Sequence, residues 1–246
     1  MKQLENKVAI VTGGSSGIGR AVALLYASEG AKVVVSDISE SGGKETVEMI
    51  KKNSGQAVFV KSDVSKPPDN EMLVRKTIES YGALHIACNN AGIGGPLAPT
   101  GEYAIEDWNK VISVNLSGVF YGMRYQIPEM LKSGEGVIVN MSSILGMVGF
   151  KKAPAYTAAK HGLIGLTKTA ALEYGDKNIR INVVGPAFIK TPMIESIDDK
   201  LIVPLHPIGR LGTPEEVADL VLFLSSKKSS FITGNYFAVD GGYLAQ

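Results

Sequence analysis

The sequence predicts an α/β protein built on one doubly wound parallel sheet of about seven strands, with helices on both faces. Short runs rich in valine and isoleucine alternate with longer helical stretches, which is typical of a parallel sheet covered by helices. The first run, Lys7 to Thr12, is continuously apolar, as expected of a strand buried on both faces. A glycine-rich loop follows it directly. We expect a single domain over residues 1–246, since no linker or low-complexity tract interrupts the alternation.

Composition and charge exclude several classes of protein. The chain has 246 residues, 45% of them hydrophobic, and a formal net charge of +1, so we expect no nucleic-acid partner. No apolar run approaches about 18 residues, and the polar start lacks the apolar segment of a signal peptide, so we expect no membrane partner. Cys88 is the single cysteine, which excludes an intrachain disulfide. A reducing compartment fits, and we expect a cytoplasmic protein without a metal site.

The hydrophobic pattern assigns the individual elements. Strands are expected over Lys7–Thr12, Ala31–Ser36, Ala57–Val60, Leu84–Cys88, Gly136–Met141, Ile179–Val184 and Asn235–Val239. Helices are expected over Arg20–Glu29, Ser39–Asn53, Pro67–Tyr81 and Ile105–Leu131, within Ala153–Thr169 and over Thr213–Ser225.

Proline and glycine refine these assignments. Thr213 is an expected N-cap followed by proline at the first helical position. The long helix after Ile105 is expected to be weakened by Gly118, Gly122 and Pro128. Residues 190–210 contain three prolines, and we expect an irregular loop there that is either a substrate lid or a plain connection.

The loop after the first strand has the spacing G-x-x-x-G-x-G. A glycine-rich turn lets the backbone approach a pyrophosphate, and the next helix offers free N–H groups and a positive dipole end. The alternative is a tight turn without a ligand. The residues expected to contact a dinucleotide here are Gly13, Ser15, Ser16, Gly17, Ile18 and Gly19.

Two acidic residues follow strands on the same side of the sheet. Asp37 lies about 20 residues past the glycines, where a carboxylate accepts from ribose hydroxyls and repels a 2′-phosphate. Neither the loop serines nor Ile38 is basic, so NAD(H) is favoured over NADP(H). The alternative is that Asp37 caps the next helix. Asp63, followed by Val64, either contacts the adenine amino group or is a turn residue.

Asparagines mark two further places. Asn90-Ala91-Gly92 opens a loop of small residues at the end of the fourth strand, where ligands of open α/β sheets bind. Asn115 lies in an apolar part of the long expected helix, and a buried amide needs partners. It either holds a water and bends the helix, or it is satisfied by neighbouring backbone.

A tyrosine and a lysine four residues apart are the candidate catalytic pair. In a helix, Tyr156 and Lys160 share one face. A phenol has a pKa of about 10, and a nearby positive charge lowers it. A general acid or base works best when its pKa lies near the working pH. The fifth strand delivers Ser142 and Ser143 to the same edge. The alternative is an ordinary surface pair on a helix.

Together, these motifs resemble the short-chain dehydrogenase/reductase family. The resemblance covers about Lys7 to Tyr243 and rests on Thr12-Gly13-x-x-x-Gly17-x-Gly19, Asn90-Ala91-Gly92, Asn115, Ser143, Tyr156-x-x-x-Lys160 and Asp240-Gly241-Gly242. It implies one Rossmann-type domain that binds the dinucleotide and carries the catalytic residues. The segment Gly209 to Ala218 is similar to bacterial ketone reductases and acyl-carrier-protein reductases.

The resemblance also implies roles. Tyr156 would protonate the substrate carbonyl oxygen, or deprotonate the alcohol in reverse. Ser143 would hydrogen-bond to that oxygen; it is favoured over Ser142 because the family usually places this hydroxyl thirteen residues before the tyrosine. Lys160 would hold the nicotinamide ribose and lower the Tyr156 pKa. Asn115 would support a water-linked proton relay.

One segment departs from the family pattern. Gly185-Pro186-Ala187 stands where the family usually has Pro-Gly, and the methyl of Ala187 would narrow the pocket or shift the backbone after it. Pro186, Ile189 and Thr191 are still expected to bind the cofactor, with Thr191 on the carboxamide.

The candidate substrate residues are almost all apolar, and no basic residue among them would hold a carboxylate or phosphate. They are Gly94, Leu145, Ala153, Ala187, Phe188, Met193, Leu201 and Leu205. We therefore expect a hydrophobic ketone or secondary alcohol. His206 would either hydrogen-bond to the substrate or be an exposed loop imidazole, and the second interpretation is favoured.

The leading expectation is an NAD-dependent alcohol dehydrogenase or ketone reductase. The first alternative is a 3-oxoacyl-thioester reductase; most such enzymes prefer NADP(H), which Asp37 disfavours. The second is a non-catalytic dinucleotide-sensing protein, which an intact Ser143, Tyr156 and Lys160 disfavours. Family members are often tetramers, so a homotetramer is expected.

Overall fold

Seven parallel strands form one sheet in the computed structural model, which describes residues 2–246. Along the sheet the order is β3-β2-β1-β4-β5-β6-β7. The strands are β1 Val8–Thr12, β2 Lys32–Asp37, β3 Gln56–Lys61, β4 Ile86–Asn89, β5 Gly136–Met141, β6 Ile179–Pro186 and β7 Tyr236–Val239. The predicted fold class and all seven strands are confirmed, with the largest boundary shifts in β4 and β6.

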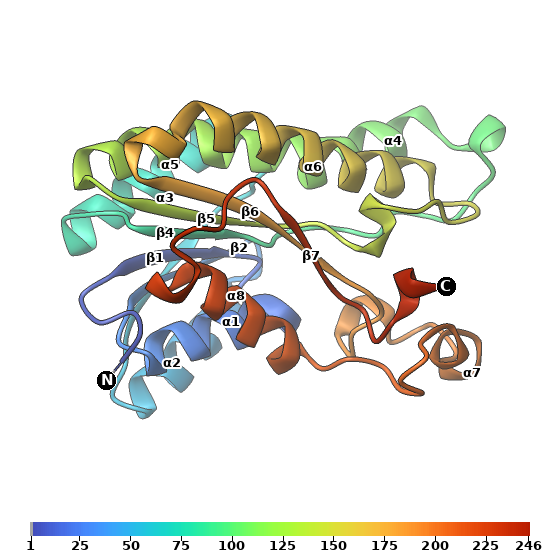
Figure 1. Cartoon of the computed structure of the whole chain (residues 1–246), viewed down its shortest axis with the longest axis horizontal. Coiled ribbons are helices and arrows are strands. Elements are labelled where there is room, and N and C mark those ends of the chain that lie inside the picture. Colours follow the sequence, from blue (N-terminus) through green and yellow to red (C-terminus); the bar gives the residue numbers. More distant parts are fainter. Residues whose placement is uncertain (1) are drawn as a thin grey trace.

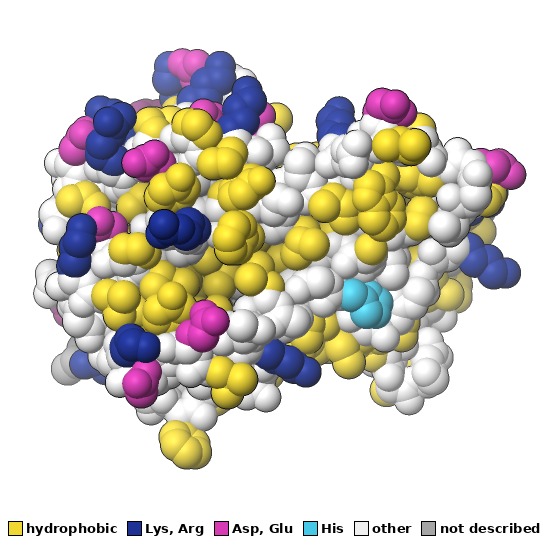
Figure 2. All heavy atoms as spheres, turned by 90° about the horizontal axis from the view of Figure 1, so that it is seen from above, with side chains coloured by type: hydrophobic (Ala, Val, Ile, Leu, Met, Phe, Trp, Pro, Cys, Tyr) yellow, Lys and Arg dark blue, Asp and Glu magenta, His cyan; other side chains and the backbone are white. Residues whose placement is uncertain are grey.

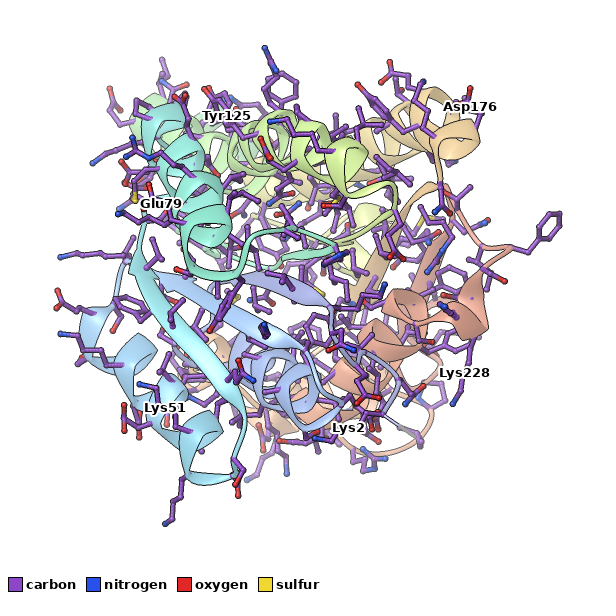
Figure 3. The ribbon with its side chains drawn as sticks, turned by 90° about the vertical axis from the view of Figure 1, so that its left-hand side faces the viewer. Lys2, Lys51, Glu79, Tyr125, Asp176 and Lys228 are labelled. Carbon is purple, nitrogen blue, oxygen red and sulfur yellow. The ribbon has the colours of Figure 1, made fainter. Side chains whose placement is uncertain are left out.

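Helices cover both faces of this sheet (Figure 1). Their bounds are α1 Gly17–Ser28, α2 Glu40–Lys52, α3 Pro67–Tyr81, α4 Ile105–Ile112, α5 Gly118–Ser133, α6 Pro154–Tyr174, α7 Asp199–Ile202 and α8 Pro214–Ser225. Figure 3 views the sheet from its end, with Glu79 of α3 and Tyr125 of α5 on one side and Lys51 of α2 on the other. Side chains alternate along β1, so that Val11 packs toward α1 and Ile10 toward α5.

The strand order reverses between β1 and β4, and this is where the ends of the two strands separate. Asn90 bridges them. Its Nδ2 donates to the Thr12 carbonyl at 3.0 Å, and its N–H donates to Thr12 Oγ1 at 3.0 Å. Such a reversal opens a crevice for ligands at the carboxyl ends of the strands.

The predicted long helix is interrupted, but not at its glycines or its proline. Residues Ser113–Ser117 form a π-helical turn between α4 and α5. Gly118 and Gly122 instead allow close packing, since a Cβ at Gly118 would lie 3.0 Å from the Val64 carbonyl oxygen. Helix α5 runs through these glycines and Pro128, and the expected weakening stays a prediction.

Residues 190–210 are less irregular than predicted. They include α7 and short 3-10 turns at Pro192–Ile194 and Val203–Leu205. A hydrogen bond joins the two ends of the segment: the Lys190 N–H donates to the Gly212 carbonyl at 2.9 Å. Among residues 2–246, no helix combines the length and apolar character needed to cross a bilayer.

A buried polar network fixes α6 to the centre of the sheet. Asn140 of β5 donates to Thr167 Oγ1 on α6 at 2.9 Å and accepts from Asn89 of β4 at 3.0 Å. Gln126 of α5 donates to Asn89 Oδ1 at 2.8 Å. Buried amides are costly unless they are paired, so this network favours one placement of α5 and α6.

Asn140→Ala should lower the free energy of unfolding by roughly 2–3 kcal/mol, because Asn89 and Thr167 lose buried partners. Urea denaturation measures this loss. Asn53→Ala is the matched control: its amide donates to Met49 in an exposed position, and the expected change is within about 0.5 kcal/mol. Equal losses in the two variants would contradict the role given to the network.

Candidate active site

The glycine loop forms a cradle that only glycine permits. Gly13 and Gly17 have φ of +66° and +50°, which L side chains rarely adopt. A Cβ at Gly19 would lie 2.1 Å from the Gly13 carbonyl oxygen. The loop leads into α1, whose first N–H groups are free of helical partners. This geometry fits the phosphates of a dinucleotide.

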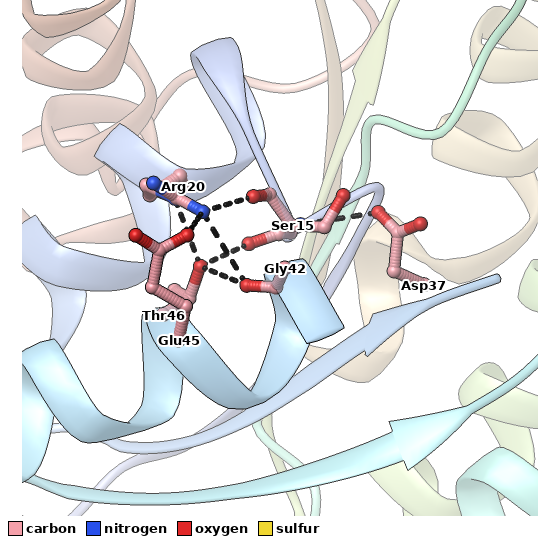
Figure 4. Close-up of polar contacts among 7 residues, drawn as sticks. Ser15, Arg20, Asp37, Gly42, Glu45 and Thr46 are labelled. Atoms are coloured by element: carbon pink, nitrogen blue, oxygen red, sulfur yellow. Dashed lines mark hydrogen bonds and ion pairs between the residues drawn. The ribbon is translucent and has the colours of Figure 1, made fainter. Parts of the chain in front are cut away.

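Asp37 contacts the backbone on two sides. One carboxylate oxygen accepts from the Ser39 N–H at 2.9 Å, which is a local turn and not a helix cap, since Ser39 itself is the N-cap of α2. The other accepts from the Ser15 N–H of the glycine loop at 3.1 Å (Figure 4). The carboxylate therefore lies at the end of β2, beside the glycine loop. The ribose contact stays a prediction.

Arg20 is a residue that sequence reasoning missed. Its guanidinium donates to the Ser15 carbonyl at 2.5 Å, to Thr46 at 3.0 Å and to Glu45 at 2.5 Å (Figure 4). Thr46 in turn donates to the Gly14 carbonyl at 2.9 Å. Arg20 thus fastens the glycine loop to α2. The sequence signal that could have indicated this role is the position of Arg20 directly after the last glycine of the loop.

Of the two roles predicted for Asp63, a turn residue or a contact to adenine, the structure shows the turn. One carboxylate oxygen accepts from both the N–H and the hydroxyl of Ser65, at 3.0 and 2.7 Å, and Lys66 lies 3.6 Å from the other. The Ser65 hydrogen bond is the largest cause of the lowered pKa of Asp63. Contact with adenine, together with Val64, stays a prediction.

Asn115 is satisfied by backbone. Its Oδ1 accepts from the Ile93 N–H and its Nδ2 donates to the Ile93 carbonyl, both at 2.8 Å. The side chain thereby joins the π turn to the loop of Asn90, Ala91 and Gly92. A Cβ at Gly92 would lie 3.3 Å from Asn115 Oδ1 and 3.7 Å from Lys160 Nζ. The backbone interpretation is the one that the structure shows, and a water held at the turn stays a prediction.

Lys160 is buried beside Tyr156. Its ammonium donates to the Met141 carbonyl at 2.7 Å and lies 5.4 Å from the centre of the Tyr156 ring. Burial lowers the pKa of Lys160 from 10.5 to about 8. The alternative of a surface pair on a helix is wrong for this lysine, since only 3% of it is exposed.

The pKa of Tyr156 shifts opposite to the expectation. Burial of the phenol raises its pKa above 10, and a hydrogen bond with Ser143 acts in the lowering direction but is the smaller effect. The net shift is therefore opposite to the one expected, and Lys160 is not among its causes. The physical reason is that burial disfavours both charged forms, the phenolate and the ammonium.

The two serines after β5 have different surroundings. Ser142 Oγ donates to the main-chain carbonyl of Lys160 at 2.9 Å, so that hydroxyl is engaged in holding α6. Ser143 Oγ accepts from the Leu145 N–H at 3.2 Å and interacts with Tyr156. The arrangement favours Ser143, as predicted, over Ser142.

The segment after β6 returns toward the glycine loop. A Cβ at Gly17 would lie 3.1 Å from the Thr191 side chain, so Thr191 is next to the loop, as a cofactor residue should be. Ile189 is buried and bridges to Gly212. Ala187 extends the pairing of β6, since its N–H donates to the Val239 carbonyl at 3.0 Å. Whether the methyl narrows the pocket or shifts the backbone after it stays a prediction.

Ala187 and Phe188 line a cavity of about 90 Å³ whose walls do not include Ser143, Tyr156 or Lys160. Its other walls include His206, Arg210, Glu216 and Asp240. Arg210 is already paired with Glu216 through two contacts of 2.7 and 2.9 Å.

The expectation of an exposed His206 is wrong. The imidazole is buried, and its ring centre lies 5.8 Å from those of Phe188 and Tyr243. Nδ1 is 2.8 Å from the Ile202 carbonyl; because a carbonyl only accepts, Nδ1 carries the proton. Nε2 then presents a lone pair and has no partner within residues 2–246. Contact with substrate stays a prediction.

The remaining substrate candidates divide by burial. Leu145 and Ala153 are buried, whereas Gly94, Met193 and Leu201 are exposed and Leu205 is partly buried. Ile38, after Asp37, is also exposed. In the described chain, residues 2–246, no three His, Cys, Asp or Glu side chains are grouped as metal ligands.

Comparisons with known proteins agree with this geometry. The family model described as Enoyl-(Acyl carrier protein) reductase matches residues 13–244. Cyclohexanol dehydrogenase of Acinetobacter sp. (strain SE19) is 49% identical over 244 residues, covering 99% of this chain and 97% of its own. A 3-oxoacyl-(acyl-carrier-protein) reductase of Thermotoga maritima is 42% identical, covering 98% of each chain.

Cis-4-hydroxycyclohexanecarboxylate dehydrogenase of Sinomonas cyclohexanicum is 39% identical, covering 97% of each chain. The crystal structure of levodione reductase superposes with a TM-score of 0.95 at 35% identity, covering 98% of this chain and 99% of its own. Family model, relatives and fold agree over nearly the whole length. The chain therefore belongs to the short-chain dehydrogenase/reductase family and is an oxidoreductase that acts on CH–OH groups with a nicotinamide cofactor.

Proposed function

We propose that this protein interconverts secondary alcohols and ketones on six-membered carbocyclic rings and uses NAD(H). The observation that carries the proposal is the grouping of the buried Ser143 and Lys160 with the half-buried Tyr156. The relatives support the ring: one is named for cyclohexanol and another for a hydroxycyclohexanecarboxylate. The whole chain, 1–246, would act as one catalytic domain, with residues 190–210 as a lid.

The cofactor would be held along the carboxyl ends of β1, β2 and β4. The glycine loop would receive the pyrophosphate, Asp37 the adenosine ribose, and Asp63 and Val64 the adenine. Asn90 to Gly92, Pro186, Ile189 and Thr191 would contact the nicotinamide half. Bound NAD(H) supplies the hydride chemistry.

The choice of NAD(H) over NADP(H) depends on charge near Asp37. The carboxylate repels a 2′-phosphate, and Ile38 offers no cation. Arg20 is close, but its guanidinium already bonds Glu45, the Ser15 carbonyl of the glycine loop and the Gly42 carbonyl of α2. Its charge is compensated, which supports a preference for NAD(H).

Side chains of the protein would carry out the proton transfer. Tyr156 would donate it to the carbonyl oxygen, and Ser143 would hydrogen-bond to that oxygen. The charge of Lys160 would stabilise the phenolate that remains and hold the nicotinamide ribose. The π turn at Asn115 would support a water in the relay that returns the proton.

A second candidate is a 3-oxoacyl-thioester reductase, which the 42% identical Thermotoga maritima relative favours. The net charge of +1 offers no evident docking surface for an acidic carrier protein. A non-catalytic dinucleotide sensor is disfavoured by the complete Ser143, Tyr156 and Lys160 set.

We further propose a cytoplasmic homotetramer. Hydrophobic side chains are spread over the face that carries α4, α5 and α6 (Figure 2). Trp108, Phe120 and Leu172 are exposed large residues of these three helices. Such a face suits contact with a second copy of the chain.

Purified protein should oxidise cyclohexanol with NAD⁺ and reduce cyclohexanone with NADH, and it should act more slowly on an acetoacetyl thioester. The apolar candidates Leu145 and Phe188 suit a ring without charge. NADH absorbance measures both directions. A higher kcat/KM for the thioester would favour the second candidate.

Tyr156→Phe is the control for the chemistry. It should lower kcat by at least about a hundredfold, since the proton donor is lost while the ring shape is retained. NADH binding, followed by fluorescence, should be unchanged. Substantial residual reduction would remove Tyr156 from the acid role.

The two directions should respond differently to pH. Ketone reduction needs a protonated phenol and a charged ammonium; the raised pKa of Tyr156 keeps the first through neutral pH, and the pKa of Lys160 at about 8 limits the second. Reduction should therefore fall as pH rises through about 8. Alcohol oxidation needs the phenolate and should increase toward alkaline pH. A reduction rate that is constant to pH 10 would contradict this assignment.

Asp37→Ala should weaken the preference for NADH over NADPH by roughly tenfold or more, since one unit of repelling charge is removed. The ratio of kcat/KM for the two cofactors measures the change. Glu48→Ala is the control, because Glu48 is also acidic but lies exposed on α2, where it pairs with Lys51. An unchanged ratio in Asp37→Ala would defeat the ribose argument.

A further inference from the structure

The phenol of Tyr236 reaches from the edge of the sheet to the loop that carries Ser143. Its hydroxyl donates to the main-chain carbonyl of Ser143 at 3.1 Å. Tyr236 begins β7 and Ser143 follows β5, so the side chain spans β6, which lies between them. The contact joins residues 93 positions apart in the chain. None of the motifs that indicate the active site includes this tyrosine.

The path of the phenol is open because residue 185 is glycine. A Cβ at Gly185 would lie 2.0 Å from the Tyr236 hydroxyl oxygen and 2.3 Å from the carbon that bears it. Val183 pairs with Tyr236, and Gly185 is two residues further along β6, on the same face of the sheet. The ring therefore leans along this face and covers Gly185. Gly185 is the first residue of the segment Gly185-Pro186-Ala187, which departs from the family pattern.

Tyr236 is a hydrogen-bond donor at any physiological pH. Burial and the nearby charge of Asp240 raise the pKa of Tyr236 to about 12. A protonated phenol donates to a carbonyl, which only accepts. The hydrogen bond from Tyr236 to Ser143 therefore does not depend on pH near neutrality, because the phenol stays protonated there.

The Ser143 carbonyl accepts twice. The Gly146 N–H donates to it at 2.9 Å within the 3-10 turn Ile144–Gly146, and Tyr236 supplies the second bond. A fixed carbonyl fixes the peptide plane after Ser143 and, with it, the direction of the Ser143 side chain. We propose that Tyr236 is a positioning residue for the Ser143 hydroxyl and that Gly185 is its required neighbour; this rests on the proposed role of Ser143.

Tyr236→Phe removes the donor and keeps the ring. We expect kcat for cyclohexanone to fall roughly three- to tenfold, while the dissociation constant of NADH is unchanged. Tyr26→Phe is the matched control. It also removes a phenol hydroxyl, in this case a fully buried one that is 2.5 Å from Ser225 Oγ between α1 and α8, and it should leave kcat unchanged.

A double-mutant cycle separates positioning from a general structural effect. In a Ser143→Ala background, Tyr236→Phe should change kcat less than about twofold, because no hydroxyl remains to be positioned. The same fall in both backgrounds, or no fall in the wild-type background, would overturn the proposal. So would an equal fall in Tyr26→Phe.

A third measurement needs no turnover and stays decisive if ring alcohols are not the substrates. Gly185→Ala should lower the melting temperature, since its Cβ meets the Tyr236 ring. Adding Tyr236→Ala should recover part of that loss, because the space is vacated. Losses that simply add would show that the ring does not lie over Gly185 and would overturn the geometry on which the proposal stands.

Discussion

The site depends on the burial of the Lys160 ammonium at the carboxyl end of β5. A buried charge is tolerated only when it is hydrogen-bonded, and here the Met141 carbonyl accepts from it at 2.7 Å. Ser142, the next residue in the chain, donates a hydrogen bond to the Lys160 main-chain carbonyl. Both the side chain and the main chain of Lys160 are therefore bonded to the segment that ends β5. Gly92 lies close enough that a Cβ there would be 3.7 Å from the ammonium.

Burial sets the protonation of the site more strongly than the pairing of charges does. Burial raises the pKa of Tyr156 above its ordinary value and so favours the neutral phenol, while it lowers the pKa of Lys160 to about 8. At neutral pH the pair is thus a protonated phenol beside a cation, which is the state a proton donor needs. The expected direction of the Tyr156 shift was wrong because the helical spacing shows proximity but not burial.

Local patterns predicted the strands and the cap at Thr213, because these depend on residues near one another in the chain, whereas the roles of the catalytic candidates come from the family resemblance and stay predictions. Thr213 does form the capping box with Glu216, for example. Three features depend on distant contacts and were not predictable in this way. They are the pairing of Arg20 with Glu45, the π turn that Asn115 joins to Ile93, and the burial of His206 against Phe188 and Tyr243.

The departure around Pro186 divides into two independent adjustments. Gly185 makes room for the Tyr236 ring and so concerns the Ser143 side of the site. Ala187 keeps its hydrogen bond to Val239, and its methyl faces the cavity shared with Phe188 and His206. The first change acts on the group that would orient the reacting oxygen, and the second on a wall that would contact the rest of the substrate. One adjustment thus lies before Pro186, against Tyr236, and the other lies after it, in the wall of the cavity.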